Sequence, residues 1–165
     1  AGAMVLSPTT EDKGFIDFAL HSDGTGKEHF TILAGGSEKP ASIETVNNRE
    51  HYFKMDGKAV FDTATKVVPE NIIEILERNN FKIEDIAFLL PHQPSIRILQ
   101  EIARKVNLPF EKVKTNMDRY ANTSGGTVPI ILDETHKNNE FKKGDILLFA
   151  AVGAGWTWGT ALYKW

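Results

Sequence analysis

The sequence predicts an α/β domain, and two features of its apolar patterning carry the prediction. Two short and nearly uninterrupted apolar runs, at 87–90 and 146–152, have the length of buried strands. The segments before and between them place apolar residues at the three- and four-residue spacing of amphipathic helices. With 165 residues, 41% of them apolar, the chain can build one domain with a substantial core. We therefore expect a single domain over residues 1–165, with no internal repeat or low-complexity segment.

The first half of the chain is expected to form a strand, a long surface excursion and a long helix. Phe15 to His21 alternates weakly between apolar and polar residues, which predicts a strand, and the turn-forming residues 22–26 follow it. Residues 30–52 are polar, contain Gly, Pro and Asn, and show no clear periodicity, so we expect an excursion of the kind that often serves function. Residues 59–80 have helical spacing, and Pro69 should kink or restart that helix.

The second half is expected to alternate strands and helices and to close on a hairpin. The apolar residues at 87–90 suit a strand buried on both faces, and Ser95 is placed to cap the helix that follows. The further elements expected are, in order, a helix at 96–106, a short strand at 112–116, a polar loop at 118–126, a helix at 128–136 and two strands at 146–152 and 157–165. Helices between strands are typical of the α/β class.

Composition narrows the possible functions. The 19 basic and 22 acidic residues give a net charge of −3, so the chain has no overall positive field to bind nucleic acid or an anionic membrane. It contains no cysteine, which excludes disulfides, thiolate metal sites and a cysteine nucleophile of its own. No apolar run approaches the roughly 18 residues of a membrane span. The first residues lack the basic and apolar regions of a signal peptide, so we expect a cytoplasmic protein.

Several familiar site motifs are absent. The five histidines have no metal-ligand spacing, so no metal is expected. There is no G-x-S-x-G elbow for an esterase serine. The glycines of 153–159 do not fit the dinucleotide fingerprint, because they are one residue too widely spaced and join two predicted strands instead of opening a helix. We expect no cofactor.

Three clusters remain where chemistry could be carried, and they lie at the ends of predicted strands or in a polar loop: His92-Gln93, residues 122–126 and residues 153–156. A histidine at a strand tip can act as a donor or a general base. The Asn122 amide before Gly-Gly can donate to an oxyanion, and a glycine-rich loop permits close approach. Each also has a structural explanation: a hydrogen-bonded core histidine, an ordinary turn and a tight hairpin.

Arg97 follows His92 on the predicted helix, with Arg104 and Lys105 one to two turns further on. These residues form either a solvated helix face or a small basic patch beside the site for an acidic partner or a phosphate.

Taken together and in this order, the clusters resemble the C-terminal half of a β-ketoacyl-ACP synthase III, a family of the thiolase-like superfamily. The matching stretches are residues 21–24, 55–61, 90–93, 118–124 and 153–159. Residues 1–6 resemble the segment that follows a Gly-Asp near the junction of the two halves in this family. That resemblance favours a chain that begins inside a longer protein over a tag scar ending before Met4.

The resemblance implies a Cys-His-Asn site in which the cysteine belongs to the N-terminal half, which is expected to be absent here. His92 matches the catalytic histidine and Asn122 the catalytic asparagine. The implied reaction loads an acyl group from acyl-CoA onto the cysteine and joins it to malonyl-ACP with loss of CO2. His92 and Asn122 would hold the oxyanion that forms on the malonyl thioester. By itself the chain should be inactive.

Other matching positions imply contacts with substrate and carrier protein. Met55, Lys58 and Phe61 match the segment that borders the pantetheine tunnel, and Arg97 matches a position implicated in docking acyl carrier protein. Ser95 stands where the family commonly has an asparagine, which shortens a contact to the pantetheine arm. The loop containing Gly153, Gly155 and Trp156 matches the glycine-rich loop beside the nucleophile. Here Ala154 stands where the family often has Gly, Trp156 where it often has Phe, and Lys58 where it often has Asn. The resemblance therefore does not identify the acyl group that the enzyme uses as its starter unit.

The implied fold is a layered αβαβα arrangement of two similar halves, usually paired into a homodimer. With one half present, an unusually apolar exposed face is expected, and with it association or poor solubility. Two alternatives stay open. One is a condensing enzyme of secondary metabolism with a different acyl donor, and the other is a non-catalytic subunit that pairs with a Cys-bearing thiolase-like chain.

Overall fold

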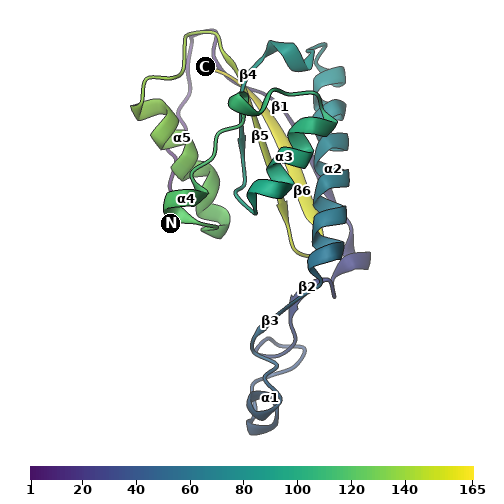
Figure 1. Ribbon diagram of the computed structural model, residues 1–165. Helices are drawn as coiled ribbons and strands as arrows, with labels where there is room; N and C mark the ends of the chain where they lie inside the picture. The colour runs from purple at the N-terminus through teal and green to yellow at the C-terminus, as the bar shows by residue number, and fades with distance from the viewer.

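In the computed structural model, which describes residues 1–165, a four-stranded sheet is covered by helices on both faces (Figure 1). The strand order is β1-β6-β5-β4, in which β4 and β5 are parallel and the other two pairings are antiparallel. The strands are β1 at Gly14–Ser22, β4 at Ile86–Pro91, β5 at Ile146–Gly153 and β6 at Thr157–Lys164. The α/β class and the terminal hairpin are thus confirmed.

Helices α2 (Gly57–Arg78) and α3 (Ile96–Lys105) cover one face of the sheet and bury the main core. This core holds 18 buried apolar residues, most of them from the two helices and the four strands, and the others from the segment that follows α3. Each helix begins at a polar cap, since Asp56 accepts from the Ala59 N–H and Ser95 from the Ile98 N–H. The expected capping role of Ser95 is confirmed.

Helix α2 runs through Pro69 without a break, so of the kink or restart expected at this residue, the restart is wrong. A proline cannot donate to the carbonyl four residues earlier, which here belongs to Thr65. Lys105 of α3 supplies the missing donor, because its Nζ lies 2.8 Å from the Thr65 carbonyl oxygen. The neighbouring helix therefore satisfies the group that proline leaves without a partner.

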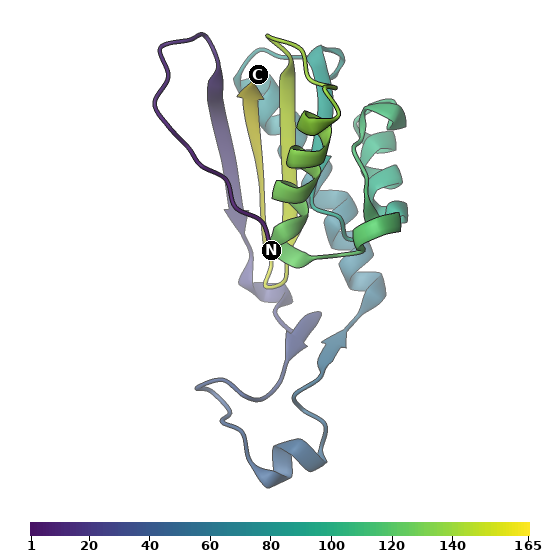
Figure 2. The same ribbon diagram turned by 90° about the vertical axis from the view of Figure 1, so that its left-hand side faces the viewer.

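Helix α5 (Thr127–Lys137) covers only part of the opposite face. It packs Ile131 against Leu90 and Leu147 of β4 and β5, and leaves β1 open on that side (Figure 2). Phe18 and Leu20 of β1 are 51% and 74% exposed, which is unusual for large apolar side chains in a sheet. The expected apolar exposed face is therefore present on β1.

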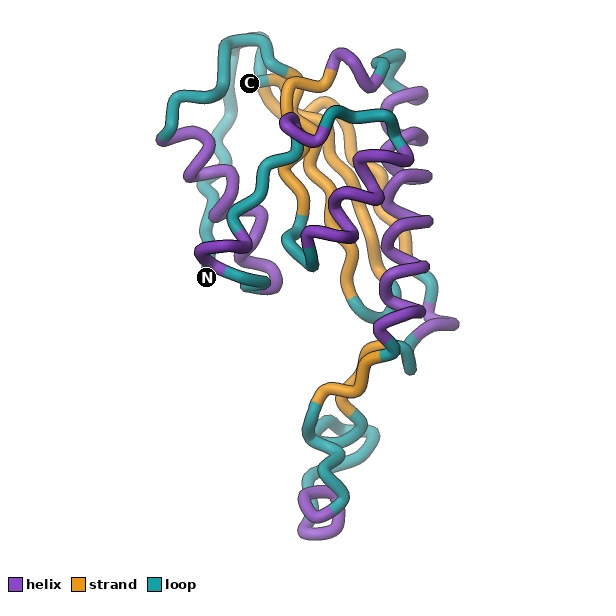
Figure 3. The backbone as a smooth tube through the Cα atoms, in the orientation of Figure 1, coloured by secondary structure: helices purple, strands orange, loops and turns teal.

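The excursion after β1 projects from one end of the sheet (Figures 1 and 3). Its stem consists of the antiparallel strands β2 (Phe30–Ile32) and β3 (Phe53–Met55), and its tip carries the short helix α1 (Ile43–Asn47). A capping box between Ser42 and Thr45 starts α1. The excursion is confirmed, but these small elements gave no periodic signal in the sequence.

The segment before the polar loop differs from its expected form. Residues 112–116 make no strand, and only Val113 forms an isolated bridge to Leu89. The Lys114 N–H still donates to the Leu89 carbonyl, but the Asn116 N–H bonds to the Gln93 side chain instead of to a strand. The short helix α4 (Met117–Tyr120) then occupies the first part of the expected loop.

None of the helices combines the length and apolarity needed to span a bilayer.

Candidate active site

The topology of the sheet brings the expected site segments to one edge. β4 is parallel to β5, and two successive antiparallel pairings make β1 parallel to β5 as well. The carboxyl ends of these three strands therefore point the same way, toward the edge where α/β folds usually place their sites. The loop after β4, the β5–β6 turn and the start of α2 lie at this edge, the lower end of the sheet in Figure 3.

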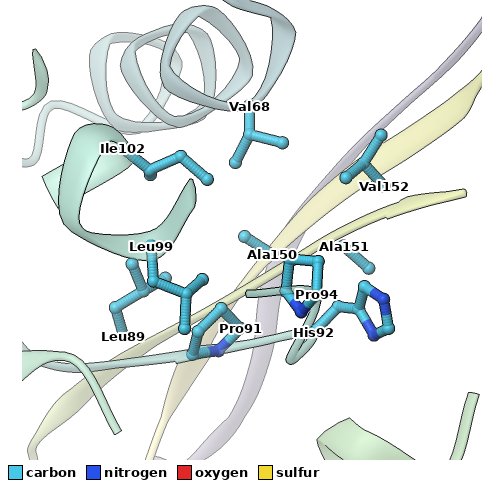
Figure 4. Close-up of a pocket in the computed structure, with 10 residues that line it drawn as sticks. All are labelled: Val68, Leu89, Pro91, His92, Pro94, Leu99, Ile102, Ala150, Ala151 and Val152. Atoms are coloured by element: carbon cyan, nitrogen blue, oxygen red, sulfur yellow. The ribbon is translucent and has the colours of Figure 1, made fainter. Parts of the chain in front are cut away.

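His92 is the first residue after β4, and the sheet fixes its backbone. Its N–H donates to the Ala150 carbonyl at 2.7 Å, which extends the β4–β5 ladder by one bond. The half-buried ring lies at the rim of an apolar hollow between the sheet and helices α2 and α3, and points away from Leu89 and Leu99 (Figure 4). The hollow, with a volume of about 10 Å³, is too small for an organic ligand.

Burial lowers the pKa of His92, while the Ser124 carbonyl acts in the opposite direction. The apolar lining of the hollow explains the larger effect, because a charged imidazolium is poorly solvated there. The ring is therefore neutral at pH 7 and can exchange a proton with a bound group.

Asn122 lies in the loop between α4 and α5, and a single hydrogen bond orients its amide. Its Oδ1 accepts from the Ser124 N–H at 2.9 Å, which leaves Nδ2 as a free donor on the other side of the amide. The residue before it, Ala121, and the residue two positions after it, Ser124, both have a φ of 54°. Such conformations are costly for residues other than glycine and concentrate at functional sites.

Hydrogen bonds join His92 to Asn122 in one continuous chain. His92 Nδ1 lies 2.8 Å from Thr127 Oγ1, and that hydroxyl lies 2.9 Å from the Ser124 carbonyl oxygen. The N–H of the same Ser124 donates to Asn122. Thr127 is the first residue of α5 and is only 2% exposed. The two clusters that the sequence presents separately therefore form one constellation.

A second hydrogen-bond network joins the end of β4 to the segment that leads to Asn122. The side chain of Gln93 is fully buried, donates to the carbonyls of Pro91 and Lys114, and accepts from the Asn116 N–H. Asn116 in turn donates to Glu134 of α5 at 2.6 Å. Because every polar atom of the Gln93 amide has a partner, the loop toward Asn122 is fixed to the end of β4.

The β5–β6 turn is held by the loop after β1. The N–H of Asp23 donates to the Trp156 carbonyl at 2.8 Å, and the Trp156 N–H donates back to Asp23. The buried indole of Trp156 rests on Gly26, where an added Cβ would lie only 2.1 Å from Nε1. The indole N–H also approaches His29 Nδ1, at 3.4 Å. Gly155 has a φ of 133°, which requires glycine at this turn.

The other expected substrate-contacting residues lie near this edge but form no hydrogen bond to His92 or Asn122. Met55 and Phe61, at the end of β3 and the start of α2, are exposed. Lys58 forms an ion pair with Asp62 one turn further along α2. The Ser95 hydroxyl is engaged as the α3 cap. Gly153, the last residue of β5, is exposed.

Arg97 lies on the exposed side of α3 and makes no ion pair, whereas Arg104 and Lys105 both lie within ion-pair distance of Glu101. Of the three basic residues on this helix, Arg97 is thus the one whose charge no neighbour neutralises.

Sequence reasoning missed Thr127 and the clamping role of Gln93. The available signal was slight: a hydroxyl residue three positions after Ser124, at the start of a helix, often bonds back to the earlier carbonyl. That local bond is present, but the approach of His92 from 35 residues away is a tertiary contact that no local pattern encodes.

Comparisons with known proteins agree on one family. Residues 76–165 match the family described as 3-oxoacyl-[acyl-carrier-protein (ACP)] synthase III C terminal. The β-ketoacyl-[acyl-carrier-protein] synthase III of Porphyromonas gingivalis is 45% identical over 165 residues, which are 100% of this chain and 49% of that protein. The corresponding synthase of Solibacter usitatus is 43% identical over 168 residues, covering all of this chain and 51% of the relative.

The structural comparison gives the same result. The crystal structure of 3-oxoacyl-[acyl-carrier-protein] synthase III from Aquifex aeolicus superposes with a TM-score of 0.83 and 30% identity, over 96% of this chain and 47% of that one. The chain spans about half the length of the curated relatives it matches. Its fold is thus the thiolase-like α/β fold expected from the sequence, and the chain belongs to the 3-oxoacyl-[acyl-carrier-protein] synthase III C-terminal family.

Proposed function

We propose that this chain is the C-terminal domain of a condensing enzyme of fatty acid biosynthesis, which joins an acyl-CoA starter to malonyl-ACP by decarboxylative Claisen condensation. The observation that supports this most is the single hydrogen-bonded constellation of His92, Thr127, Ser124 and Asn122 at the carboxyl edge of the sheet. The family match and the relatives, whose names describe synthases of acyl-carrier-protein substrates, support the same class of acyl substrates.

The reaction makes specific demands on the site. When the malonyl thioester loses CO2, the electrons of the breaking carbon–carbon bond move onto the thioester, and negative charge develops on its oxygen. A donor preorganised toward that oxygen stabilises the transition state, and losing one such donor typically costs about 10² to 10³ in rate. Asn122 has the free Nδ2 donor for this purpose, and His92 offers its ring as the second group.

The nucleophile must come from outside residues 1–165, because this chain contains no cysteine. In the proposed enzyme a Cys thiolate on the N-terminal half takes the acyl group from CoA. The carbanion formed from malonyl-ACP then attacks that acyl carbon, a new carbon–carbon bond forms, and the Cys thiolate leaves. We therefore propose that the chain is inactive without this half, and that the complete enzyme pairs into a homodimer.

The remaining expected residues take supporting roles in this proposal. Met55, Lys58, Phe61 and Ser95 would contact the pantetheine arm. Gly153, Gly155 and Trp156 would form the loop beside the nucleophile. Arg97, whose charge is unpaired on the open side of α3, would dock the acidic acyl carrier protein. The exposed apolar surface around Phe18 and Leu20 would pack against the other half.

The test is the rate of malonyl-ACP decarboxylation by the complete enzyme, measured as the release of CO2. His92→Ala and Asn122→Ala should each reduce the rate at least tenfold, because each removes a group from the oxyanion. His136→Ala and Asn138→Ala, which replace the same residue types at the far end of α5, serve as controls and should leave the rate unchanged. Unchanged rates in the two site variants would refute the proposal.

A further inference from the structure

The carboxylate of Glu134 on α5 binds the segment around helix α4 at two places. Its Oε2 accepts from Asn116 Nδ2 at 2.6 Å, and Asn116 is the residue before the helix. Its Oε1 accepts from Arg119 Nη1 at 2.6 Å, while Arg119 Nη2 lies 3.3 Å from Oε2, which is the forked arrangement of a bidentate pair. One side chain of α5 therefore fixes two residues of the segment that leads to Asn122.

Helix α4 ends in a backbone conformation that the surrounding structure has to hold. Ala121, its C-cap, has a φ of 54° and a ψ of −154°, a combination that the Cβ makes costly for any residue except glycine. Ala121 is exposed, and its N–H donates to the Met117 carbonyl at 3.0 Å, which attaches it to α4. The next residue is Asn122, so the direction of the Asn122 side chain depends on how α4 is anchored.

The anchoring contacts are largely shielded from water. Asn116 is 1% exposed, and its backbone N–H donates to Gln93 at the end of β4. The side chain of Glu134 is 18% exposed, and Arg119 is the basic residue that pairs with it, although Arg119 also lies 3.8 Å from Asp118. Hydrogen bonds in such a partly buried place are stronger than exposed ones, because water competes less for them. The segment is thus held between β4, through Gln93, and α5, through Glu134.

We infer that Glu134 is a positioning residue for Asn122. By holding Asn116 and Arg119 it fixes helix α4, and the strained turn at the end of α4 then sets the place of the Asn122 amide. Glu134 makes no hydrogen bond to Asn122 itself, so it acts through the backbone. The consequence for the reaction rests on the proposed function, in which Asn122 Nδ2 donates to the malonyl thioester oxygen. Misplacing a group at a reacting centre by about 1 Å can cost on the order of 10² in rate.

The inference can be tested on this chain without an assay of activity. Glu134→Gln keeps the shape of the side chain but removes its charge and one of its two acceptor oxygens. In ¹H–¹⁵N spectra we expect the side-chain amide signals of Asn122, identified with Asn122→Ala, to move in this variant. The signal of the Ser124 backbone N–H, which donates to that amide, should move with them.

Glu140→Gln is the matched control. It removes the ion pair that Glu140 forms with Lys114, in the segment before α4, but it leaves the contacts of α4 in place. The Asn122 signals should not move in this variant. Movement of the same size in both variants would overturn the inference, because it would show that any loss of charge near this segment displaces the amide.

Asn122 signals that stay in place in Glu134→Gln would also overturn the inference, even if the variant unfolds at lower urea concentration. A residue that only stabilises the fold changes the folded population without moving groups within the folded state. If Glu134→Gln does not fold, Arg119→Leu decides: this side chain is more than half exposed, so its loss removes one donor without opening the interior. It should move the same signals, and unmoved signals would refute the positioning role.

The complete enzyme gives a second measurement. Glu134→Gln should reduce malonyl-ACP decarboxylation about tenfold, less than the loss of the whole donor. Transfer of the acyl group from CoA to the cysteine should be unchanged, because the proposed function gives Asn122 no part in that step. Equal losses in both steps would contradict a role in positioning Asn122. If Asn122→Ala leaves decarboxylation intact, the proposed function fails, while the spectra still decide whether Glu134 positions the amide, so the two proposals can fail separately.

Discussion

Lys105 of α3 donates a hydrogen bond of 2.8 Å to the backbone carbonyl of Thr65 in α2, the carbonyl that Pro69 leaves without its helical donor. This contact explains how a long helix continues through a proline, and it ties together the two helices that cover the main core. An interhelical lysine here does what the helix's own backbone does elsewhere.

Replacing Lys105 by methionine should destabilise the protein, because the Thr65 carbonyl would lose its donor in a partly buried position. The expected loss is about 1–2 kcal/mol in the free energy of unfolding. Pro69→Ala restores a backbone N–H at this place, so Lys105→Met should cost less in that background. Urea unfolding of the four proteins in this double-mutant cycle measures the difference. Equal costs in both backgrounds would show that the carbonyl contact contributes nothing.

Gly26→Ala should displace the Trp156 indole, because the added Cβ would lie 2.1 Å from Nε1 and 2.4 Å from Cδ1. We expect a clear shift of the Trp156 indole N–H resonance in ¹H–¹⁵N spectra, and an altered preference among acyl-CoA starters in the complete enzyme. Gly24→Ala is the control, since a Cβ there meets no atom within 4 Å. An indole resonance that stays in place in Gly26→Ala would contradict the packing described.

The open apolar face of β1 should make this chain associate when it is alone. We expect size-exclusion chromatography to show oligomers, and a fluorescent apolar dye to bind. Replacing both Phe18 and Leu20 by serine should reduce both effects, because these two side chains are 51% and 74% exposed. Ile73→Ser, which changes a 44% exposed side chain on α2, should not. A wild-type chain that is monomeric and binds no dye would contradict this account of the face.

The lowered pKa of His92 should make stability depend on pH. Burial disfavours the charged ring in the folded protein, so the unfolded chain binds a proton at higher pH than the folded one. The free energy of unfolding should therefore fall as the pH drops through the ordinary histidine range, near about 6.5. It should stop falling once the folded protein also binds the proton. His92→Gln should flatten this part of the curve, and a curve unchanged by the variant would contradict the assignment.

The sequence predicts the large elements well, because their apolar periodicity reflects burial directly. The buried strand at 87–90 and the helix of 59–80 are both found, within a few residues at their ends. The expected restart at Pro69 failed because the compensating donor comes from Lys105, 40 residues away. The expected strand at 112–116 failed for a similar reason, since the Gln93 side chain binds the Asn116 N–H.

The candidate site shows the same division. His92 and Asn122 could be proposed from residue type, from local position and from the family resemblance. Thr127, which links them, could not, because a threonine at the start of a helix is ordinary until the fold brings His92 within 2.8 Å of it. The residue types that could carry the chemistry can be identified from the sequence, whereas the contacts that orient their side chains depend on the tertiary structure.

In the proposed enzyme, this chain supplies the histidine and asparagine of a site whose cysteine lies on another part of the protein. The most direct measurement is product formation from an acyl-CoA and malonyl-ACP, by this chain alone and after co-expression with a Cys-bearing N-terminal half. Intact-mass spectrometry then locates the acyl group. We expect product only when both parts are present, with the acyl adduct on the Cys-bearing half and none on residues 1–165. Product from this chain alone, or none from a correctly assembled pair, would contradict it.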